Sequence, residues 1–449
     1  MKRPAMPSVR ASPSHSSPET ELLFLLARPR LSAQATERIG VLLRGDLNWV
    51  LFVGSALSHD VLSLVSQRLL RMPAGTVPDA ILDQLRRYVD QHVRRAGRLV
   101  NELLRLFALL EAHSISALTF KGPALAAALY GDASVRAFSD IDFLIHRRDA
   151  VRARDVVLRA GYHLHKTPLD EQGFPQEGGM YEYTFMREDG RAMVELHWRL
   201  TPPRLRASLD LEHLGGRHQR VPLDGTSVPT LTAEDALLVL CIHGDKHQWG
   251  LLKWICDVAE LVTANPDLDW SRVEADARLL GCRRMVGLGL RLASDLLDAP
   301  LPDHLSARIQ AEPRLSCLVG QVHRELVRGE RPDLAERALV RTYHPFHLVE
   351  RVSDWWWNAR RGVRQLLAPN ANDTKLVRLP GPLRLGYYPL RCARLLAVHG
   401  LTPLVRLATH QLLLQQPRRP SDNRRRPGHL THRDSDDRGI GNADDDATV

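Results

Sequence analysis

Apolar residues recur at helical spacing in two long parts of the chain. In residues 19–96, and again in residues 232–416, they fall three and four positions apart, as in WVLFVGSALSHDVLSLVSQRLL, which is typical of amphipathic helices. The second part begins at Thr232, which we expect to be a helix N-cap because Asp235 follows three residues later. Both parts are therefore predicted to be helical.

Between these parts the pattern alternates between helix and strand. The predicted strands are ALTF, IDFLIH, YEYTFM and AMVELHWRL, and the predicted helices are RLVNELLRLFALLEAH, PALAAALYG and RDAVRARDVVLRAGY. Gly161 ends the last of these helices, and Glu188-Asp189-Gly190 is a turn signal that joins the last two strands in a hairpin. This order predicts a small module with a mixed sheet.

The resulting fold class is α+β, with a small mixed-sheet core flanked by helical regions on both sides. The two ends of the chain lack hydrophobic periodicity, and we expect them to be disordered. The chain then divides into a disordered N-terminus (1–18), an N-terminal helical region (19–96), the core (97–225), a C-terminal helical region (226–416) and a disordered tail (417–449).

The composition is that of an ordinary globular protein, with 44% hydrophobic and 25% charged residues in a chain of 449. The formal net charge of +9 suits a polyanionic partner such as a nucleotide. Nucleic-acid binding has no support beyond this charge, because the sequence has no zinc finger, RNA-recognition signature or basic helix with base-reading residues.

The cysteines, the N-terminus and the longest apolar runs predict a cytoplasmic protein. The five cysteines include no CxxC pair, so neither a zinc knuckle nor a disulfide framework is indicated. The N-terminus lacks the apolar segment of a signal peptide, and no apolar run is long enough to span a bilayer. The stretch DWWWN suits a domain interface within the chain, and the basic amphipathic segment that begins at Leu383 suits a solvated helix face. Peripheral membrane contact stays open as an alternative for both.

Two carboxylates stand at the beginning of an otherwise apolar strand. Residues i and i+2 of a strand share a face, so Asp140 and Asp142 converge while Ile141 and Phe143 face the other side. At a separation of ~5 Å and an effective dielectric constant of ~20, the two charges repel by about 3 kcal/mol. Mg²⁺ would remove this repulsion, because it binds through one or two carboxylates and leaves positions for water and substrate phosphates.

The segment before these carboxylates suits phosphate binding. A strand that ends in Lys121-Gly122 and turns directly into a helix exposes backbone N–H groups at the positive end of the helix dipole. Gly122 would let a phosphate approach the backbone, and Lys121 would add a positive charge. Arg136 is placed to pair with phosphate or to hold the carboxylates in position. Each feature alone also has a structural interpretation, as a turn, a loop or a salt bridge.

In this order the features resemble the core of the polymerase-beta-type nucleotidyltransferase superfamily. There a Gly follows the first strand, a helix leads to a second strand with Asp-x-Asp, and a third carboxylate comes from a later strand. More closely, the chain resembles the family of bacterial uncharacterised nucleotidyltransferases, in the segments LTFKGPALAAALYGDASVRAFSDIDFLI, VELHWRL and ALLVLCIHGDKHQWGLLKWICDVAELV.

The resemblance implies that Glu195 in VELHW is the third carboxylate. It would complete a catalytic metal cluster with Asp140 and Asp142, and it is the candidate general base for an acceptor hydroxyl. Glu195 and His197 share one face of their strand, and His197 is a candidate phosphate contact. The alternatives are a surface glutamate and a structural histidine. Lys246 in HGDKH is a candidate triphosphate contact, with a plain surface lysine as the alternative.

We therefore expect a Mg²⁺-dependent nucleotidyltransferase that binds ATP or another nucleoside triphosphate and uses a small molecule, peptide or protein as acceptor. The acceptor hydroxyl would attack the α-phosphorus, and pyrophosphate would leave. Superfamily members usually have Ser after the loop Gly, whereas this chain has Pro123. This keeps open a non-catalytic adaptor that acts in natural-product or polysaccharide biosynthesis. A nucleotidylating toxin acting on tRNA or protein is a third alternative.

Overall fold

The computed structural model of the protein describes most of the chain up to Arg328 and a few later residues. The described residues are 17–165, 181–203, 205, 207–328, 350, 356, 360 and 386–391. Residues 1–361 form one compact unit and residues 362–449 a second. The predicted disordered tail lies outside the described residues, as do residues 1–16 of the predicted disordered N-terminus. Of the DWWWN stretch only Trp356 is described, and of the segment after Leu383 only residues 386–391.

The strands of the described residues form one seven-stranded mixed sheet, in the order β3-β4-β5-β2-β1-β7-β6. They are β1 (Ala117–Thr119), β2 (Asp140–Ile145), β3 (Tyr162–Leu164), β4 (Glu182–Arg187), β5 (Met193–His197), β6 (Gln219–Leu223) and β7 (Thr226–Thr230). At the centre, β2 pairs antiparallel with β1 and parallel with β5. The predicted α+β class with a mixed sheet is confirmed, and so is the hairpin of β4 and β5 around Gly190.

The hairpin of β6 and β7 was not predicted. The sheet continues to Thr230, past the expected end of the core at residue 225, where a helical region was expected to begin. Asp224 and Gly225 connect the two strands, both with positive φ, and Asp-Gly is the sequence signal for such a turn. Pro222 and Pro229 weaken the strand pattern, because proline cannot donate a ladder hydrogen bond.

In the described residues, helices form the two flanking regions, as predicted. In the N-terminal part and the core they are α1 (Pro18–Ala27), α2 (Ala33–Leu43), α3 (Trp49–Ser58), α4 (Leu62–Leu69), α5 (Asp79–Ala112), α6 (Gly122–Tyr130), α7 (Ala150–Arg159) and α8 (Leu211–Leu214). After the sheet they are α9 (Ala233–Lys246), α10 (Leu252–Ala264), α11 (Trp270–Leu280), α12 (Arg283–Leu297), α13 (Asp303–Gln310) and α14 (Pro313–Arg328). Thr232 is the N-cap of α9, and its side chain accepts a hydrogen bond from the backbone N–H of Asp235.

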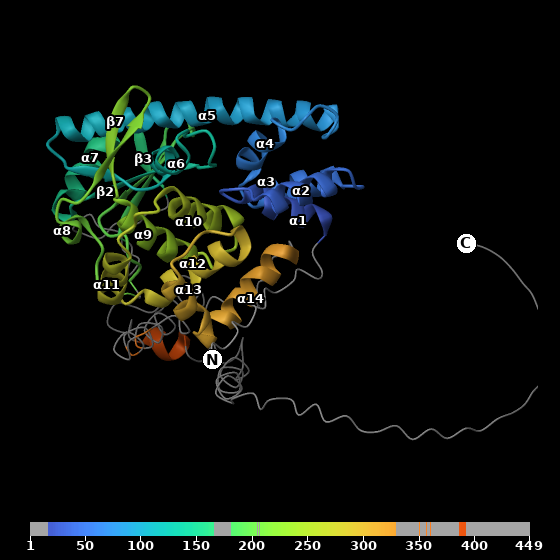
Figure 1. Cartoon of the computed structure of the whole chain (residues 1–449). Helices are drawn as coiled ribbons and strands as arrows, with labels where there is room; N and C mark the ends of the chain where they lie inside the picture. The colour runs from blue at the N-terminus through green and yellow to red at the C-terminus, as the bar shows by residue number, and fades with distance from the viewer. Residues whose placement is uncertain are drawn as a thin grey trace, which may run out of the picture. The chain divides into compact units, whose positions relative to one another are not determined.

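Helix α5 is continuous across the expected boundary between residues 96 and 97. Its 34 residues correspond to about 50 Å at 1.5 Å per residue. In Figure 1 it runs along the top, over α4 at one end and over α6, α7 and the sheet at the other. No proline interrupts it, and Gly97 is exposed, so its lack of a side chain leaves no gap in the core. The N-terminal helices and the sheet therefore share one rigid element.

Two hydrophobic cores lie on opposite faces of the sheet. Ile141, Phe143 and Ile145 of β2 pack with residues of α5 and α7 in what we call the sheet core. Leu144, which faces the other way, packs in a larger helical core that contains residues of both α1–α4 and α9–α14. Because Asp142 shares the parity of Leu144, its side chain lies on the face covered by the helical core.

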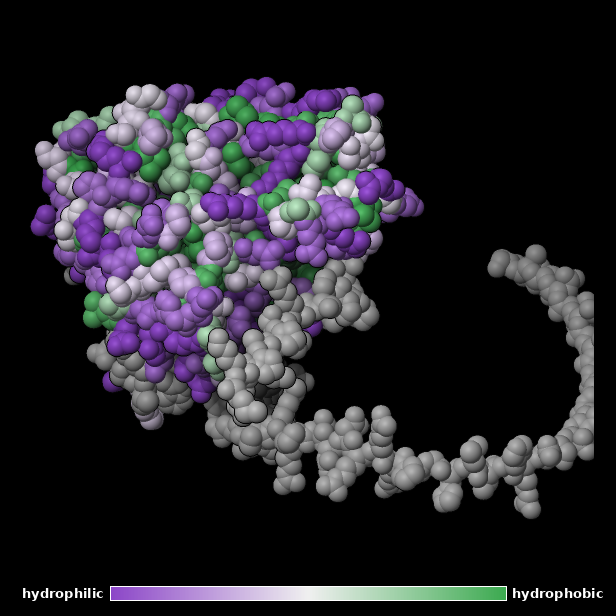
Figure 2. Space-filling model, in the orientation of Figure 1, coloured by the Kyte–Doolittle hydropathy of each residue, from purple (hydrophilic) through white to green (hydrophobic). Residues whose placement is uncertain are grey.

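The outer surface mixes hydrophilic and hydrophobic residues without a large apolar area on the face shown in Figure 2. Exposed large hydrophobic side chains include Val50, Leu51 and Leu57 of α3. Among the described residues, no helix has both the length and the apolar character needed to cross a membrane.

Trp249, after α9, is the largest fully buried side chain among the described residues. A Cβ added to Gly244 of α9 would lie 2.5 Å from its ring, and one added to Gly289 of α12 would lie 2.8 Å from it. Gln248 and Trp249 both have positive φ, at 57° and 55°, which is costly for residues other than glycine. The ring's close fit between two glycines offsets this cost and locks the turn after α9.

We expect Gly244→Ala to lower the free energy of unfolding by about 1–3 kcal/mol, because the added methyl group overpacks a rigid indole. Gly97→Ala in α5 is the matched control, since its Cβ meets no atom within 4 Å, and we expect it to stabilise the protein by about 0.5–1 kcal/mol. Denaturant unfolding of both variants measures the difference. Equal effects of the two substitutions would contradict the fit around Trp249.

Candidate active site

The parallel pairing of β2 and β5 brings two acidic side chains together. Asp142 lies directly across from Glu195 in the register. Asp142 is 1% exposed, and neither of its carboxylate oxygens has a hydrogen-bond partner. Its Oδ1 lies 3.3 Å from His197 Nε2 and 3.6 Å from Lys121 Nζ, which are ion-pair contacts without hydrogen-bond geometry. A buried carboxylate with open lone pairs is a fitting ligand for a cation.

The His197 imidazole lies among three carboxylates. Its Nε2 is 3.1 Å from Glu195 Oε2, and its Nδ1 is 2.9 Å from Oε2 of Glu182. Its ring also meets Phe120 edge-on, with centroids 5.1 Å apart. Burial disfavours the charged imidazole, but the carboxylates of Asp142, Glu182 and Glu195 outweigh this and raise the pKa of His197 well above its usual value.

Asp142, Glu195 and His197 could together hold a metal ion, and we call these three residues the acidic cluster. Their donor atoms lie within 4.8 Å of one another, and the described residues contain no other such group of three. Two members of the expected metal set, Asp142 and Glu195, are therefore side by side. Asp140 is outside this group, so its role as a ligand stays a prediction. His197 lies between the carboxylates, and its contact with phosphate stays a prediction.

Electrostatics separate the two aspartates of β2. Burial and the charges of Asp142 and Glu195 raise the pKa of Asp140. Burial acts in the same direction on Asp142, but the charge of Lys121 and the contact with His197 prevail and lower its pKa. Asp142 is thus the firmly ionised member of the pair, as a metal ligand must be.

Gly122 fixes the start of α6 against the start of β2. Its φ is +56°, and a Cβ there would lie 2.7 Å from the backbone oxygen of Asp140. The predicted order of strand, Lys-Gly and helix is confirmed by β1 and α6. Lys121 extends toward Asp142, as described above, so the first turn of α6 and a positive charge lie close to the acidic cluster. Phosphate binding by Lys121 and Gly122 stays a prediction.

Arg136 lies in a buried ion pair with Asp257 of α10. Its Nε and Nη2 donate to the two carboxylate oxygens at 2.8 and 2.9 Å, and the side chains are 7% and 0% exposed. The pair ties the segment before β2 to the C-terminal helices. This is the salt bridge that the sequence left open as an alternative, and a contact of Arg136 with nucleotide stays a prediction.

The end of α9 adds basic and aromatic side chains. Lys246 is exposed, with Nζ 6.0 Å from the ring centroid of Tyr181, the residue before β4. The rings of His243 and His247 lie 4.6 Å apart, and both contact the ring of Trp254 in α10. Lys246 lies close enough to Glu182 for its charge to help lower the pKa of that carboxyl. Its expected contact with triphosphate stays a prediction.

Glu182 is the site residue that sequence reasoning missed. It lies directly across from His197 in the pairing of β4 and β5. A signal was present, because counting outward by equal steps from the Asp189-Gly190 turn places residue 182 opposite residue 197. Interaction with His197 lowers the pKa of Glu182 to about 2, against the effect of burial.

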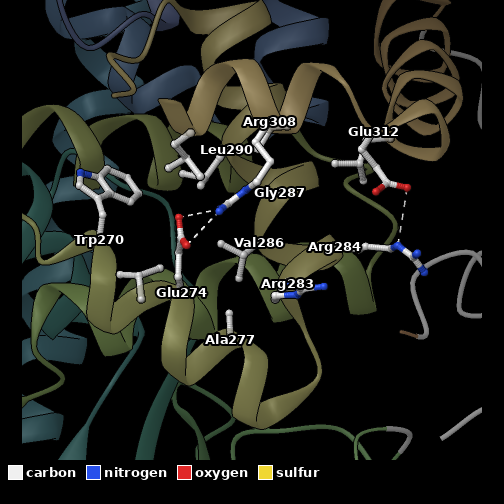
Figure 3. Close-up of a pocket in the computed structure, with 14 residues that line it drawn as sticks. Trp270, Glu274, Ala277, Arg283, Arg284, Val286, Gly287, Leu290, Arg308 and Glu312 are labelled. Carbon is white, nitrogen blue, oxygen red and sulfur yellow. Dashed lines mark hydrogen bonds and ion pairs between the residues drawn. The ribbon is translucent and has the colours of Figure 1, made fainter. Parts of the chain in front are cut away.

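A separate hollow lies among α11, α12, α13 and α14 (Figure 3). Arg308 reaches across it to Glu274, and Arg284 pairs with Glu312 at its edge. Its apolar lining includes Val286 and Leu290. None of the residues that line it belongs to the acidic cluster, so we do not assign it a part in the chemistry of that cluster.

A family model described as "Uncharacterised nucleotidyltransferase" matches residues 45–298, more than half of the chain. A comparison with curated proteins gave no match.

Two solved structures are similar to parts of the chain. One is the antibiotic-resistance factor ANT(2'')-Ia, with 14% identity and a TM-score of 0.31, covering 41% of this chain and 92% of that one. The other is an antigenic nucleotidyltransferase-like protein from Paracoccidioides brasiliensis, with 15% identity and a TM-score of 0.26, covering 51% and 93%.

We expect Gly122→Ala to destabilise the protein more than Gly131→Ala does. Gly122 begins α6 and Gly131 follows its end, both with positive φ, at +56° and +71°, but only the Cβ at position 122 meets another atom within 4 Å. The control should therefore cost about 1–2 kcal/mol for its backbone conformation alone, and Gly122→Ala should cost more. Denaturant unfolding measures both, and a smaller loss for Gly122→Ala would show that the contact with Asp140 is relaxed easily.

We expect Arg136→Leu to lower the free energy of unfolding by about 3–5 kcal/mol, because it leaves the charge of Asp257 buried without a partner. The double variant Arg136→Leu/Asp257→Leu removes both charges and should recover part of this loss. Denaturant unfolding of the single and double variants makes the comparison. A double variant less stable than the single one would mean that packing, not the unpaired charge, dominates.

Proposed function

The chain belongs to the family of uncharacterised nucleotidyltransferases, and we propose that it transfers a nucleoside monophosphate from a nucleoside triphosphate to an acceptor, releasing pyrophosphate. The observation that carries this proposal is the pairing of buried Asp142 with partly exposed Glu195 on neighbouring strands, with no hydrogen bond to either Asp142 oxygen. Family membership supports nucleotidyl transfer in general; the magnesium dependence, the pyrophosphate release and the acceptor are parts of the proposal.

In this proposal Asp142 and Glu195, with Asp140, hold Mg²⁺. When bound, a divalent cation supplies positive charge to the phosphate oxygens and polarises the phosphorus that is attacked. Lys121 and the N-terminal turn of α6 bind the triphosphate, because a lysine charge and unpaired backbone N–H groups both favour phosphate. Lys246, at the end of α9, adds a second positive charge for the triphosphate.

The reaction exchanges the phosphoanhydride bond between the α- and β-phosphates for a phosphoester bond to the acceptor. The acceptor oxygen forms a bond to the α-phosphorus, the bond between that phosphorus and the β-phosphate oxygen breaks, and pyrophosphate leaves. The side chain of Glu195 is 20% exposed, more than that of Asp142, and is our candidate to take the proton from the acceptor hydroxyl. His243, His247 and Trp254 are candidates for the acceptor side of the site.

A non-catalytic adaptor is the second candidate, and one observation favours it. His197 lies within 3.3 Å of both Asp142 and Glu195, so the acidic pair has a partial counter-charge within the protein. In that case the fold would persist without nucleotide binding. If the protein is instead a nucleotidylating toxin, an acceptor screen would identify tRNA or protein as its acceptor. A cytoplasmic location stays a prediction.

Calorimetric titration of ATP, GTP, CTP and UTP with Mg²⁺ tests the proposal. We expect wild-type protein to bind at least one triphosphate only with the metal, and Asp140→Ala/Asp142→Ala to lose this binding because the carboxylates are gone. Asp295→Ala, at an exposed surface ion pair of α12, is the control and should bind normally. Binding of no triphosphate by wild type would reject the enzyme and favour the adaptor; where binding occurs, pyrophosphate release identifies the acceptor.

A further inference from the structure

Glu182 and His197 form a contact that the proposed reaction does not use. The two residues are directly opposed in the hairpin of β4 and β5. The carboxylate of Glu182 is largely buried, with 18% of its side chain exposed, and its Oε2 lies 2.9 Å from Nδ1 of His197, an ion-pair contact without hydrogen-bond geometry. The imidazole itself is 5% exposed. Two buried groups of this kind limit each other's orientation.

This contact settles which ring nitrogen faces the acidic pair. With Nδ1 turned toward Glu182, Nε2 is left 3.1 Å from Glu195 and 3.3 Å from Asp142. Phe120 packs edge-on against the ring, at 5.1 Å between centroids, and restricts its rotation. The nitrogen that points at the two carboxylates is therefore fixed by residues outside the acidic pair.

A carboxylate that accepts from one nitrogen of a histidine leaves the lone pair of the other nitrogen for a metal. Histidines that bind metals almost always have such a partner, which fixes both the tautomer and the direction of the ring. The donor atoms of Asp142, Glu195 and His197 already lie within 4.8 Å of one another. The site thus has two carboxylate oxygens and one imidazole nitrogen converging, with a carboxylate behind the imidazole.

We propose that His197 binds the divalent cation through Nε2, together with Asp142 and Glu195, and that Glu182 is the positioning residue that orients it. This rests on the proposed function only in requiring a cation at the acidic pair. Glu182 itself does not touch the cation or the substrate. When Nε2 binds the cation, its proton is released to solvent, and Glu182 accepts a hydrogen bond from Nδ1–H.

The proposal implies a preference among metals. Carboxylates suit Mg²⁺ and Mn²⁺ alike, whereas imidazole is a better ligand for transition metals than for Mg²⁺. A site with one imidazole should therefore bind Mn²⁺ more tightly than Mg²⁺. His197→Gln should remove this advantage, lowering the affinity for Mn²⁺ more than that for Mg²⁺.

The test uses Mn²⁺ alone with the full chain, measured by calorimetry and by electron spin-echo spectroscopy, which detects the ¹⁴N nucleus of a coordinated imidazole. We expect wild type to bind Mn²⁺ with a ¹⁴N signal and His197→Gln to lose the signal. Glu182→Gln should weaken Mn²⁺ binding by about ten- to a hundredfold, the usual effect of removing such a partner. Thermal melting shows whether each variant folds.

The chain offers a matched control. Glu212 of α8 lies 2.7 Å from Nδ1 of His146, just after β2, and neither residue belongs to the acidic cluster. Glu212→Gln removes a carboxylate contact to the Nδ1 of a histidine at the surface and should leave Mn²⁺ binding unchanged. If Glu182→Gln loses its structure, His197→Gln and the wild-type ¹⁴N signal still decide whether His197 is a ligand.

The outcomes separate this inference from the proposed function. Mn²⁺ binding without a ¹⁴N signal, or with equal affinity in wild type and Glu182→Gln, overturns the inference and leaves nucleotidyl transfer intact. Absence of Mn²⁺ binding also overturns it, and the triphosphate titration with Mg²⁺ then judges the proposed function separately. A ¹⁴N signal in wild type without binding of any triphosphate supports the inference and rejects the enzyme.

Discussion

The parallel pairing of β2 with β5 is the contact on which the candidate site depends. It sets Asp142 beside Glu195 and, two residues further along β5, brings His197 to the same face. Because side chains alternate between faces, a slip of one residue would turn the carboxylates into the sheet core. The apolar residues between them prevent this slip, since Ile141 and Phe143 are fully buried on the opposite face. The packing of α5 and α7 thus holds the register that the acidic residues need.

Burying several carboxylates together requires compensating charge inside the protein. Lys121 and His197 provide it at Asp142, and the surrounding carboxylates raise the pKa of Lys121 despite its burial. Asp140, Asp142, Glu182 and Glu195 still outnumber these two basic groups, so negative charge remains in excess. An excess of negative charge is the condition under which a cation binds. The positive charges of Lys121 and Lys246 beside it would attract a triphosphate.

Local signals sufficed for the elements nearest the site and failed where pairing is long-range. The order of β1, the Lys121-Gly122 turn, α6 and β2 was predicted, as was the hairpin of β4 and β5. Each of these elements has a sequence signal within a few residues, such as a turn glycine or an alternating apolar pattern. The neighbour of β2 was not predictable in this way, since a parallel pair needs a long connection. The Arg136 contact with Asp257 joins residues 121 positions apart, and no local pattern reveals such a partner.

The helices before and after the sheet pack against the face of the sheet that carries the site. Residues of α1–α4 and α9–α14 share one core, and Leu118, Phe120 and Leu144 of the sheet belong to it. Ser63 of α4 donates a hydrogen bond to the backbone oxygen of Val135, 2.7 Å away, just before Arg136. The segment that leads into β2 is therefore held from both sides, by α4 and by α10. A sheet without these helices would expose the apolar side chains around Asp142 to water. Water would then hydrogen-bond to the Asp142 carboxylate, and the buried carboxylate that favours a cation would be lost.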